Sequence, residues 1–270
     1  MSSSADSSTS TKSDDYERVI RSAENRMVMA EEYIVPMRLV ARHMPFRDSL
    51  RILNISAAGA ELDVHASNPL SYLPSHRVEY VEGEIDEVFA TSFDKPFLAT
   101  DSRWVHVPDG SVDVVVSIAG LHHFSHDERA QLYAQCHRVL RPNGGLLVLG
   151  DVGVGSAQAA FLNGFVDAHT PTGHRGIFFE RDGADLCELK RRFGEVHVTQ
   201  ESYHWNFDSQ EHRTRFCHRL FRLQCTQQET REAIDRIFGT SESPSPHLPW
   251  NLVYFVAVRE GNPVDWLARR

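Results

Sequence analysis

The sequence lacks the marks of several protein classes. Its four cysteines are scattered and include no Cys-x-x-Cys pair, which favours reduced thiols over a disulfide framework. No apolar run approaches the roughly 20 residues that a membrane-spanning helix needs. The first residues are rich in Ser, Thr and Asp, and they lack the apolar core that a signal peptide needs. These absences predict a cytoplasmic protein that does not cross a membrane.

Basic charge is scarce as well. The 270 residues include 28 Lys and Arg against 37 Asp and Glu, which gives a formal net charge of −9. Such a chain is poorly suited to neutralising nucleic-acid phosphates, so a nucleic-acid partner is disfavoured. There is no internal repeat, and a hydrophobic fraction of 41% is typical of globular proteins. The length therefore predicts one α/β domain with additions.

The most informative stretch is a strand-helix-strand pattern in the middle of the chain. Residues 112–116 and 146–149 are short apolar runs typical of strands buried on both faces. Between them, apolar side chains recur at helical spacing over 127–140, and Ser125 is a candidate N-cap. The Pro-Asn-Gly-Gly turn at 142–145 ends this helix. The pattern predicts a βαβ unit with two parallel strands.

The rest of the chain extends this α/β pattern. Five more segments are predicted strands: 51–55, 78–81, 97–99, 195–203 and 252–258. We expect a disordered tail at 1–14 and an N-terminal helical lid at 15–45, formed by two short helices with a break at Pro36. The α/β domain would occupy 50–270, with a helical insertion at 209–240 before the last strand.

Three motifs of the central stretch resemble a known family. They are Asp113-Val114-Val115, Leu121-His122-His123 and the Arg-Val-Leu-Arg-Pro-Asn-Gly-Gly run at 138–145. In this order they resemble the second half of the nucleotide-binding core of class I S-adenosylmethionine-dependent methyltransferases. The resemblance implies a doubly wound, mostly parallel seven-stranded sheet whose last strand is antiparallel. It also implies an enzyme that uses S-adenosylmethionine to methylate a small-molecule acceptor such as a metabolite or natural-product precursor.

The same resemblance implies where the methyl donor is held. Ligands of doubly wound sheets bind beyond the carboxyl ends of the strands. The loop implied for the methionine part of the donor is Ser56, Ala57, Ala58 and Gly59, and the acid implied for the ribose is Glu82, with Glu84 as the alternative. Asp101 and Ser102 would contact the adenine, and Ser117 would face the sulfonium.

The first of these loops departs from the family pattern. Methyltransferases usually carry Gly-x-Gly-x-Gly here, whereas this chain keeps only Gly59 among small residues at 56–60. An alanine forced into a positive φ costs on the order of 1 kcal/mol. Three hypotheses follow: an active methyltransferase, a fold relative that has lost donor binding and acts as a partner-binding or regulatory subunit, or an enzyme that uses the pocket for another reaction.

The acceptor side has fewer markers. His122 or His123 could act as a general base, because histidine titrates near neutrality, or could serve structural hydrogen bonding. Expected substrate contacts are Tyr33 and Met37 of the N-terminal helices, Arg215 and Arg219 of the insertion, and the region 161–179. The other histidines and cysteines near the insertion lack the i, i+4 spacing of a zinc pair, so no metal is expected. Whether the chain forms a homo-oligomer is left open.

Overall fold

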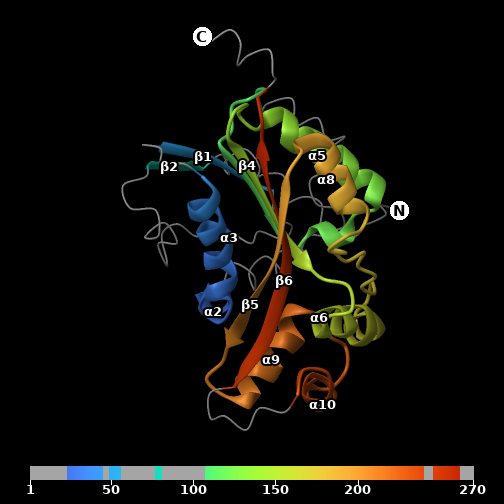
Figure 1. Cartoon of the computed structure of the whole chain (residues 1–270). Helices are drawn as coiled ribbons and strands as arrows, with labels where there is room; N and C mark the ends of the chain where they lie inside the picture. Colours follow the sequence, from blue (N-terminus) through green and yellow to red (C-terminus); the bar gives the residue numbers. More distant parts are fainter. Residues whose placement is uncertain (1–22, 45–48, 56–76, 81–106, 240–245, 262–270) are drawn as a thin grey trace, which may run out of the picture.

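A mixed six-stranded sheet forms the centre of the computed structural model, which describes residues 23–44, 49–55, 77–80, 107–239 and 246–261 (Figure 1). The strand order is β2-β1-β3-β4-β6-β5. Strands β1 to β4 pair in parallel, and β6 runs antiparallel to both β4 and β5. The bounds are Ser49–Asn54 (β1), Arg77–Tyr80 (β2), Val114–Ile118 (β3), Gly145–Val152 (β4), Val196–Asn206 (β5) and His247–Arg259 (β6).

This sheet confirms the predicted doubly wound, mostly parallel α/β fold, including its antiparallel last strand. Six of the seven predicted strands coincide with β1 to β6 within a few residues at each end. The seventh, at 97–99, lies outside the described residues, as does the predicted tail at 1–14. The count of seven strands therefore stays a prediction.

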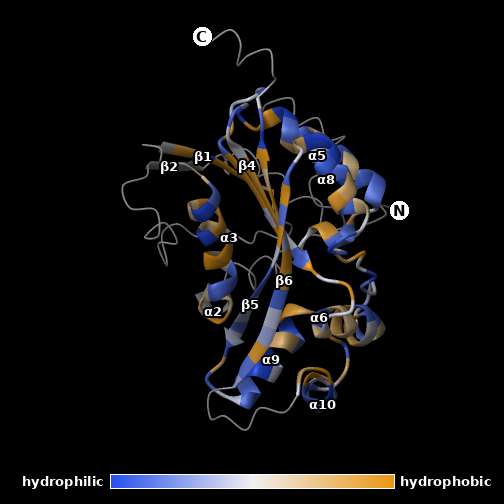
Figure 2. Cartoon of the chain, in the orientation of Figure 1, coloured by the Kyte–Doolittle hydropathy of each residue, from blue (hydrophilic) through white to orange (hydrophobic). Residues whose placement is uncertain are grey.

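The central strands are buried on both faces, which explains their continuous apolar sequence. Val114 and Val116 of β3 belong to one core cluster, whereas Val115 between them belongs to a second. Strand β4 alternates in the same way, with Leu146 in the first cluster and Leu147 in the second. Figure 2 shows these strands as the hydrophobic centre of the molecule.

Helices cover both faces of the sheet. On the first face, α3 (Ala30–His43) packs against β4 and β5. On the second face, α5 (His126–Val139) and α8 (Ala184–Phe193) pack against each other, and α8 also contacts β5 and β6. Figure 1 shows α3 and the pair α5 and α8 on opposite sides of the sheet. The predicted helix after Ser125 is thus confirmed, with Ser125 as its N-cap.

The N-terminal helices correct one expectation. The described residues 23–44 form two helices, α2 (Ala23–Val28) and α3, but the break between them lies at Met29 and not at Pro36. Pro36 sits inside α3 and is buried. A proline in a helix interior removes one backbone hydrogen bond, at a cost of about 3 kcal/mol or more in an isolated helix. Burial of this face of α3 in the core offsets that cost, so the helix continues.

The predicted helical insertion is also present. It consists of α9 (Gln210–Leu220) and α10 (Gln227–Phe238), which are joined by an ion pair between the buried Arg213 and Asp235. Three short helical segments precede α8 and were not predicted: α6 (Ala157–Ala160), the π-helical η6 (Phe161–Val166) and α7 (Asp167–His169). Both α6 and η6 contact α10.

Strands β5 and β6 extend beyond the rest of the sheet. β6 pairs with β4 only from Leu252 onward, whereas its residues 247–251 pair with β5 alone. The partners of these residues are 202–206, which lie past the carboxyl end of β4. We call this two-stranded extension, residues 202–206 and 247–251, the ribbon. It projects on the side of the sheet where ligands of this fold class bind.

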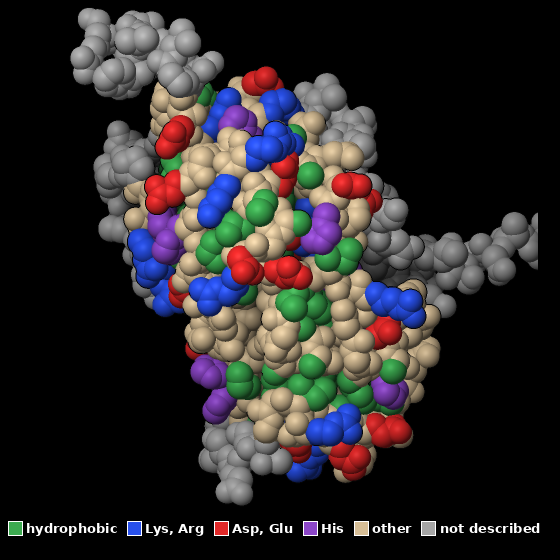
Figure 3. All heavy atoms as spheres, turned by 45° about the vertical axis from the view of Figure 1, so that its right-hand side comes forward, with side chains coloured by type: hydrophobic (Ala, Val, Ile, Leu, Met, Phe, Trp, Pro, Cys, Tyr) green, Lys and Arg blue, Asp and Glu red, His purple; other side chains and the backbone are tan. Residues whose placement is uncertain are grey.

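The described surface has a mixed character. On the face drawn in Figure 3, basic and acidic side chains are interspersed. In the described parts of the chain, no helix combines the length and the apolar character needed to span a bilayer.

The N-terminus of α5 provides a local stability prediction. Ser125 accepts the backbone N–H of Glu128, and the Glu128 carboxylate accepts the Ser125 backbone N–H at 2.9 Å. Replacing such a cap by alanine costs about 1 kcal/mol. Ser125→Ala should therefore lower the free energy of unfolding by about that amount in urea titrations, whereas Ser125→Asp, which keeps an acceptor, should retain most of it. Equal losses in the two variants would contradict the cap.

Candidate active site

Two loops meet beyond the carboxyl ends of β3 and β4. The turn η5 (Leu121–His123) follows β3, and a segment at 174–179 runs beside it, since Ile177 donates its N–H to the His122 carbonyl at 2.7 Å. Ala119, with a φ of 51°, makes the sharp turn out of β3. Residues after both parallel strands therefore gather at one edge of the sheet, where ligands of doubly wound sheets bind.

Asp151, near the end of β4, orients the His122 ring. Its Oδ1 lies 2.7 Å from His122 Nδ1, and its Oδ2 accepts the His122 backbone N–H at 2.9 Å. His122 is 5% exposed and Asp151 is fully buried. Burial alone would raise the pKa of Asp151, but the adjacent His122 and a hydrogen bond from the Val152 N–H hold it below its usual value. The carboxylate thus fixes both the position and the orientation of the imidazole.

Two further imidazoles surround His122, and we call His122, His123 and His174 the histidine cluster. His174 Nε2 lies 3.3 Å from His122 Nε2, while the His123 ring centre is 4.1 Å from that of His122. Loss of hydration, and then the neighbouring rings, lower the pKa of His123 to about 3 and that of His174 to about 4. Both rings are therefore neutral at neutral pH.

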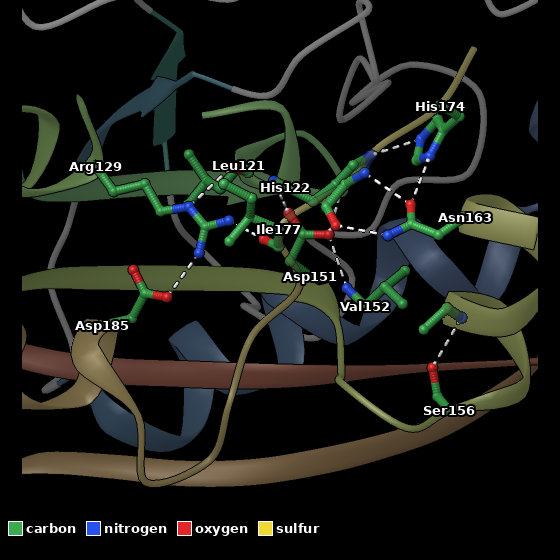
Figure 4. Close-up of polar contacts among 12 residues, drawn as sticks. Leu121, His122, Arg129, Asp151, Val152, Ser156, Asn163, His174, Ile177 and Asp185 are labelled. Atoms are coloured by element: carbon green, nitrogen blue, oxygen red, sulfur yellow. Dashed lines mark hydrogen bonds and ion pairs between the residues drawn. The ribbon is translucent and has the colours of Figure 1, made fainter. Parts of the chain in front are cut away.

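Asn163 of η6 holds His174 in place. Its Oδ1 lies 3.2 Å from His174 Nδ1 and also accepts the Gly176 N–H at 2.7 Å, while its Nδ2 donates to the Gly176 carbonyl at 2.8 Å. Figure 4 shows Asn163 and His174 to one side of His122, with Asp151 directly beside His122. A Cβ on Gly176 would approach the Phe178 ring within 2.6 Å and the His122 ring within 3.1 Å. The close approach of the 174–179 segment thus requires glycine.

Arg129 of α5 anchors the same loops from the opposite side. The side chain is completely buried, and it donates to the Leu121 carbonyl at 2.9 Å, to the Ile177 carbonyl and to Asp185 at 2.6 Å. Tyr133 also donates to Asp185, at 2.7 Å. Figure 4 shows Arg129 and Asp185 across the loop from His174. One buried ion pair therefore connects η5, the 174–179 segment and α8.

A second group of buried polar side chains lies between α3 and the ribbon. The Glu32 carboxylate accepts the Trp205 indole N–H at 2.9 Å, and Trp205 stacks on Trp250 with ring centres 4.0 Å apart. Burial is the main cause that raises the pKa of Glu32 to about 8. Burial and the neighbouring Glu32 raise the pKa of Tyr203 and Tyr254 well above the ordinary value. These polar groups are neutral near neutral pH.

Most of the predicted donor contacts cannot be compared with the structure. Ser56, Ala57, Ala58, Gly59, Glu82, Asp101 and Ser102 lie outside the described residues. Ser117 is described: its hydroxyl is buried at the end of β3 and has no hydrogen-bond partner within the described part of the chain. A buried polar group of this kind usually meets water or a ligand. Its environment therefore fits a bound ligand.

The predicted acceptor contacts are scattered. Met37 has no exposed surface and packs in the core, and only the backbone of Tyr33 is described. Arg215 is exposed, and Arg219 forms an ion pair with Glu24 at 3.2 Å. Their contact with a substrate stays a prediction.

Sequence reasoning missed three features of this edge. His174 lies 51 residues after His123 in a loop with no periodicity, and no sequence signal connected the two. Glu32 lies between Glu31 and Tyr33 in an amphipathic pattern, which gave no sign that its side chain is buried. Arg129 falls among the charged residues of α5, where a solvated side chain was the natural expectation.

Comparisons with known proteins give one family match and several distant structural likenesses. Residues 67–148 match a family model described as a methyltransferase domain. A search of curated proteins finds no significant match. Similar solved structures include a candidate methyltransferase from Bacillus halodurans, which is 16% identical, covers 84% of this chain and 98% of its own, and has a TM-score of 0.48.

Two others are the cyclopropane synthase MmaA2 from Mycobacterium tuberculosis and a SAM-dependent methyltransferase from Archaeoglobus fulgidus. The first is 15% identical, covers 91% of this chain and 94% of its own, and has a TM-score of 0.43. The second is 14% identical, with 90% and 97% covered and a TM-score of 0.41. At these values the likenesses carry no conclusion about function. The chain therefore resembles a methyltransferase domain over residues 67–148, and its mixed sheet with an antiparallel last strand has the fold expected of class I S-adenosylmethionine-dependent methyltransferases.

Proposed function

We propose that this methyltransferase acts on a small-molecule acceptor held beyond the carboxyl ends of β3 and β4. The observation that carries the proposal is the ribbon, which extends past β4 and presents Tyr203, Trp205 and Trp250 as a buried wall against α3. Trp250 Nε1 is buried and has no hydrogen-bond partner among the described residues. The net charge of −9 disfavours a nucleic-acid acceptor.

The N-terminal helices complete this side of the site. α3 contacts both β4 and β5, and its Glu32 is bonded to Trp205 of the ribbon. Glu31 of the same helix accepts the His204 backbone N–H at 3.1 Å. These contacts support the expectation that residues 15–45 form a lid over the acceptor.

Methyl transfer depends mainly on how the donor and the acceptor are positioned relative to each other. S-adenosylmethionine supplies an electrophilic methyl group, which a nucleophilic atom of the acceptor attacks in line with the departing thioether sulfur. Asp151 and Arg129 hold the loop after β3, so the histidine cluster keeps a fixed place at this edge. His123, with a pKa of about 3, is poorly matched to proton removal at neutral pH. Orientation, and not general-base catalysis by His123, is the role that the structure favours.

Donor binding is the first test of this function. The protein should bind S-adenosylmethionine and S-adenosylhomocysteine in calorimetric titrations. Asp101→Ala should weaken binding roughly tenfold or more, because a hydrogen bond to a charged group contributes about 1.5–3 kcal/mol. Asp94→Ala, which removes an acid seven residues earlier in the same segment, is the matched control.

The outcomes separate the three hypotheses. No binding up to millimolar donor would overturn the enzyme and favour a partner-binding subunit. Donor binding without methyl transfer to pooled small molecules, followed by mass spectrometry, would favour a different reaction or a macromolecular acceptor. Equal affinities of Asp101→Ala and the parent protein would remove Asp101 from the adenine site.

A further inference from the structure

Two imidazoles of the histidine cluster face each other through their Nε2 atoms, because hydrogen bonds to neighbouring residues hold their Nδ1 atoms. In His122, Nδ1 is committed to Asp151 Oδ1 at 2.7 Å. That carboxylate also accepts the backbone N–H groups of His122 and Val152, so both of its oxygens act as acceptors. His122 Nδ1 must therefore be the donor, which leaves Nε2 as the ring nitrogen available to bind an ion.

His174 is fixed in the same sense by Asn163. The amide orientation of Asn163 is set by two bonds to Gly176, one accepted from its N–H by Oδ1 and one donated to its carbonyl by Nδ2. The atom that faces His174 Nδ1 at 3.2 Å is therefore an acceptor, and Nδ1 is the donor. The neutral His174 ring thus carries its lone pair on Nε2.

The two Nε2 atoms lie 3.3 Å apart. With both Nδ1 atoms acting as donors, a cation between the Nε2 atoms, either a shared proton or a metal ion, accounts for this approach. Two imidazole nitrogens bound to one tetrahedral zinc ion, each about 2.0–2.1 Å from it, are about 3.3–3.4 Å apart. The observed separation therefore matches that of two ligands of a single ion.

His123 supplies a third ligand. One ring nitrogen of each of His122, His123 and His174 lies within 4.8 Å of the others. His123 is the most exposed residue of the three, although its ring lies against those of His122 and His174, so the ring can turn toward the other two without disturbing the core. Asp151 and Asn163 stand behind the first and third rings, as the oxygen partners of metal-bound histidines commonly do.

We propose that His122, His123 and His174 bind a divalent transition metal ion of the zinc type, with Asp151 and Asn163 as positioning residues. Neutral imidazoles suit zinc and cobalt better than magnesium or calcium, which prefer oxygen ligands. Three protein ligands leave a fourth position open for water or for an oxygen or sulfur atom of another molecule. The inference goes beyond methyl transfer, because the ion would bind without donor or acceptor.

The test uses cobalt as a spectroscopic substitute for zinc. The full-length protein, stripped with a chelator and dialysed, is titrated with Co²⁺ in the absence of S-adenosylmethionine. We expect a visible absorption band of four-coordinate cobalt that saturates at one ion per chain and disappears when Zn²⁺ is added. His174→Ala should weaken binding at least 100-fold, and Asn163→Leu should weaken it 10- to 100-fold through loss of orientation.

Controls distinguish the site from general histidine binding. His204→Ala breaks a different histidine pair, His204 and His247, whose ring centres are 4.6 Å apart, and should leave cobalt binding unchanged. Circular dichroism checks that each variant is folded. Absence of the band in the parent protein, or equal affinity in His174→Ala, would overturn the proposal and leave a shared proton as the link between the rings. Donor titrations on the metal-free protein report on the proposed function separately.

Discussion

Arg129→Met should lower the free energy of unfolding by about 3–5 kcal/mol, because it leaves the buried carboxylate of Asp185 without its charge partner. Methionine approximates the length of the arginine stem, so little of the loss should come from an empty volume. The carbonyls of Leu121 and Ile177 would also lose their donor. Urea unfolding followed by tryptophan fluorescence measures the difference.

Two further variants show where this loss originates. Arg191→Met removes an arginine that is paired with Glu188 on the surface of α8, and its stability should match that of the parent protein. The double variant Arg129→Met/Asp185→Asn should recover part of the loss, since no buried charge remains unpaired. Asp185→Asn alone lowers the stability of the parent protein by some amount. If the double variant is less stable than Arg129→Met by that same amount, the two residues act independently.

Glu32→Gln should make the protein more stable at neutral and alkaline pH. Burial in the folded protein raises the pKa of Glu32 from its ordinary value of 4.5 to about 8. A raised folded pKa contributes stability that is fully present below pH 4.5 and is lost as the pH rises through 8. The loss between pH 4.5 and 7 is on the order of 3 kcal/mol. Glutamine avoids it and can still accept the Trp205 N–H through its amide oxygen.

The measurement is the difference in unfolding free energy between Glu32→Gln and the parent protein, taken from pH 5 to 8. This difference cancels the opposite effect of His123 and His174, whose lowered pKa values destabilise both proteins alike as the pH falls below 6.5. Glu31→Gln, at an exposed neighbour of Glu32 in α3, should show no such trend. Parallel profiles for Glu32→Gln and the parent protein would mean that Glu32 is ionised in the folded state.

The sequence was most informative where a single local pattern decides the structure. The strand pattern before Ile118, the cap at Ser125 and the turn at 142–145 were all readable, because caps, turns and apolar runs depend on neighbouring residues. Pro36 shows the limit of that reasoning: its local preference was correct, but burial against the sheet outweighed it. Helix ends and breaks respond to tertiary packing that no short window contains.

The site was less accessible for the same reason. His122 and His123 stood out because they are adjacent, whereas tertiary contacts with Asn163 and Asp167 hold His174 beside them. The histidines near the insertion are close in sequence but lack the spacing of a zinc pair, yet the three nitrogens that converge come from η5 and from the 174–179 segment. Ligand sets assembled from several loops have no spacing to recognise.

The ribbon has a consequence for how such an enzyme can change. Residues 247–251 pair only with 202–206, so substitutions in either segment leave the hydrogen bonds of β4 to its neighbours intact. The wall that we propose for the acceptor is therefore separable from the parallel strands of the sheet. A lineage of such enzymes could acquire new acceptors by changing the ten residues of the ribbon, while the residues that bind the methyl donor stay the same.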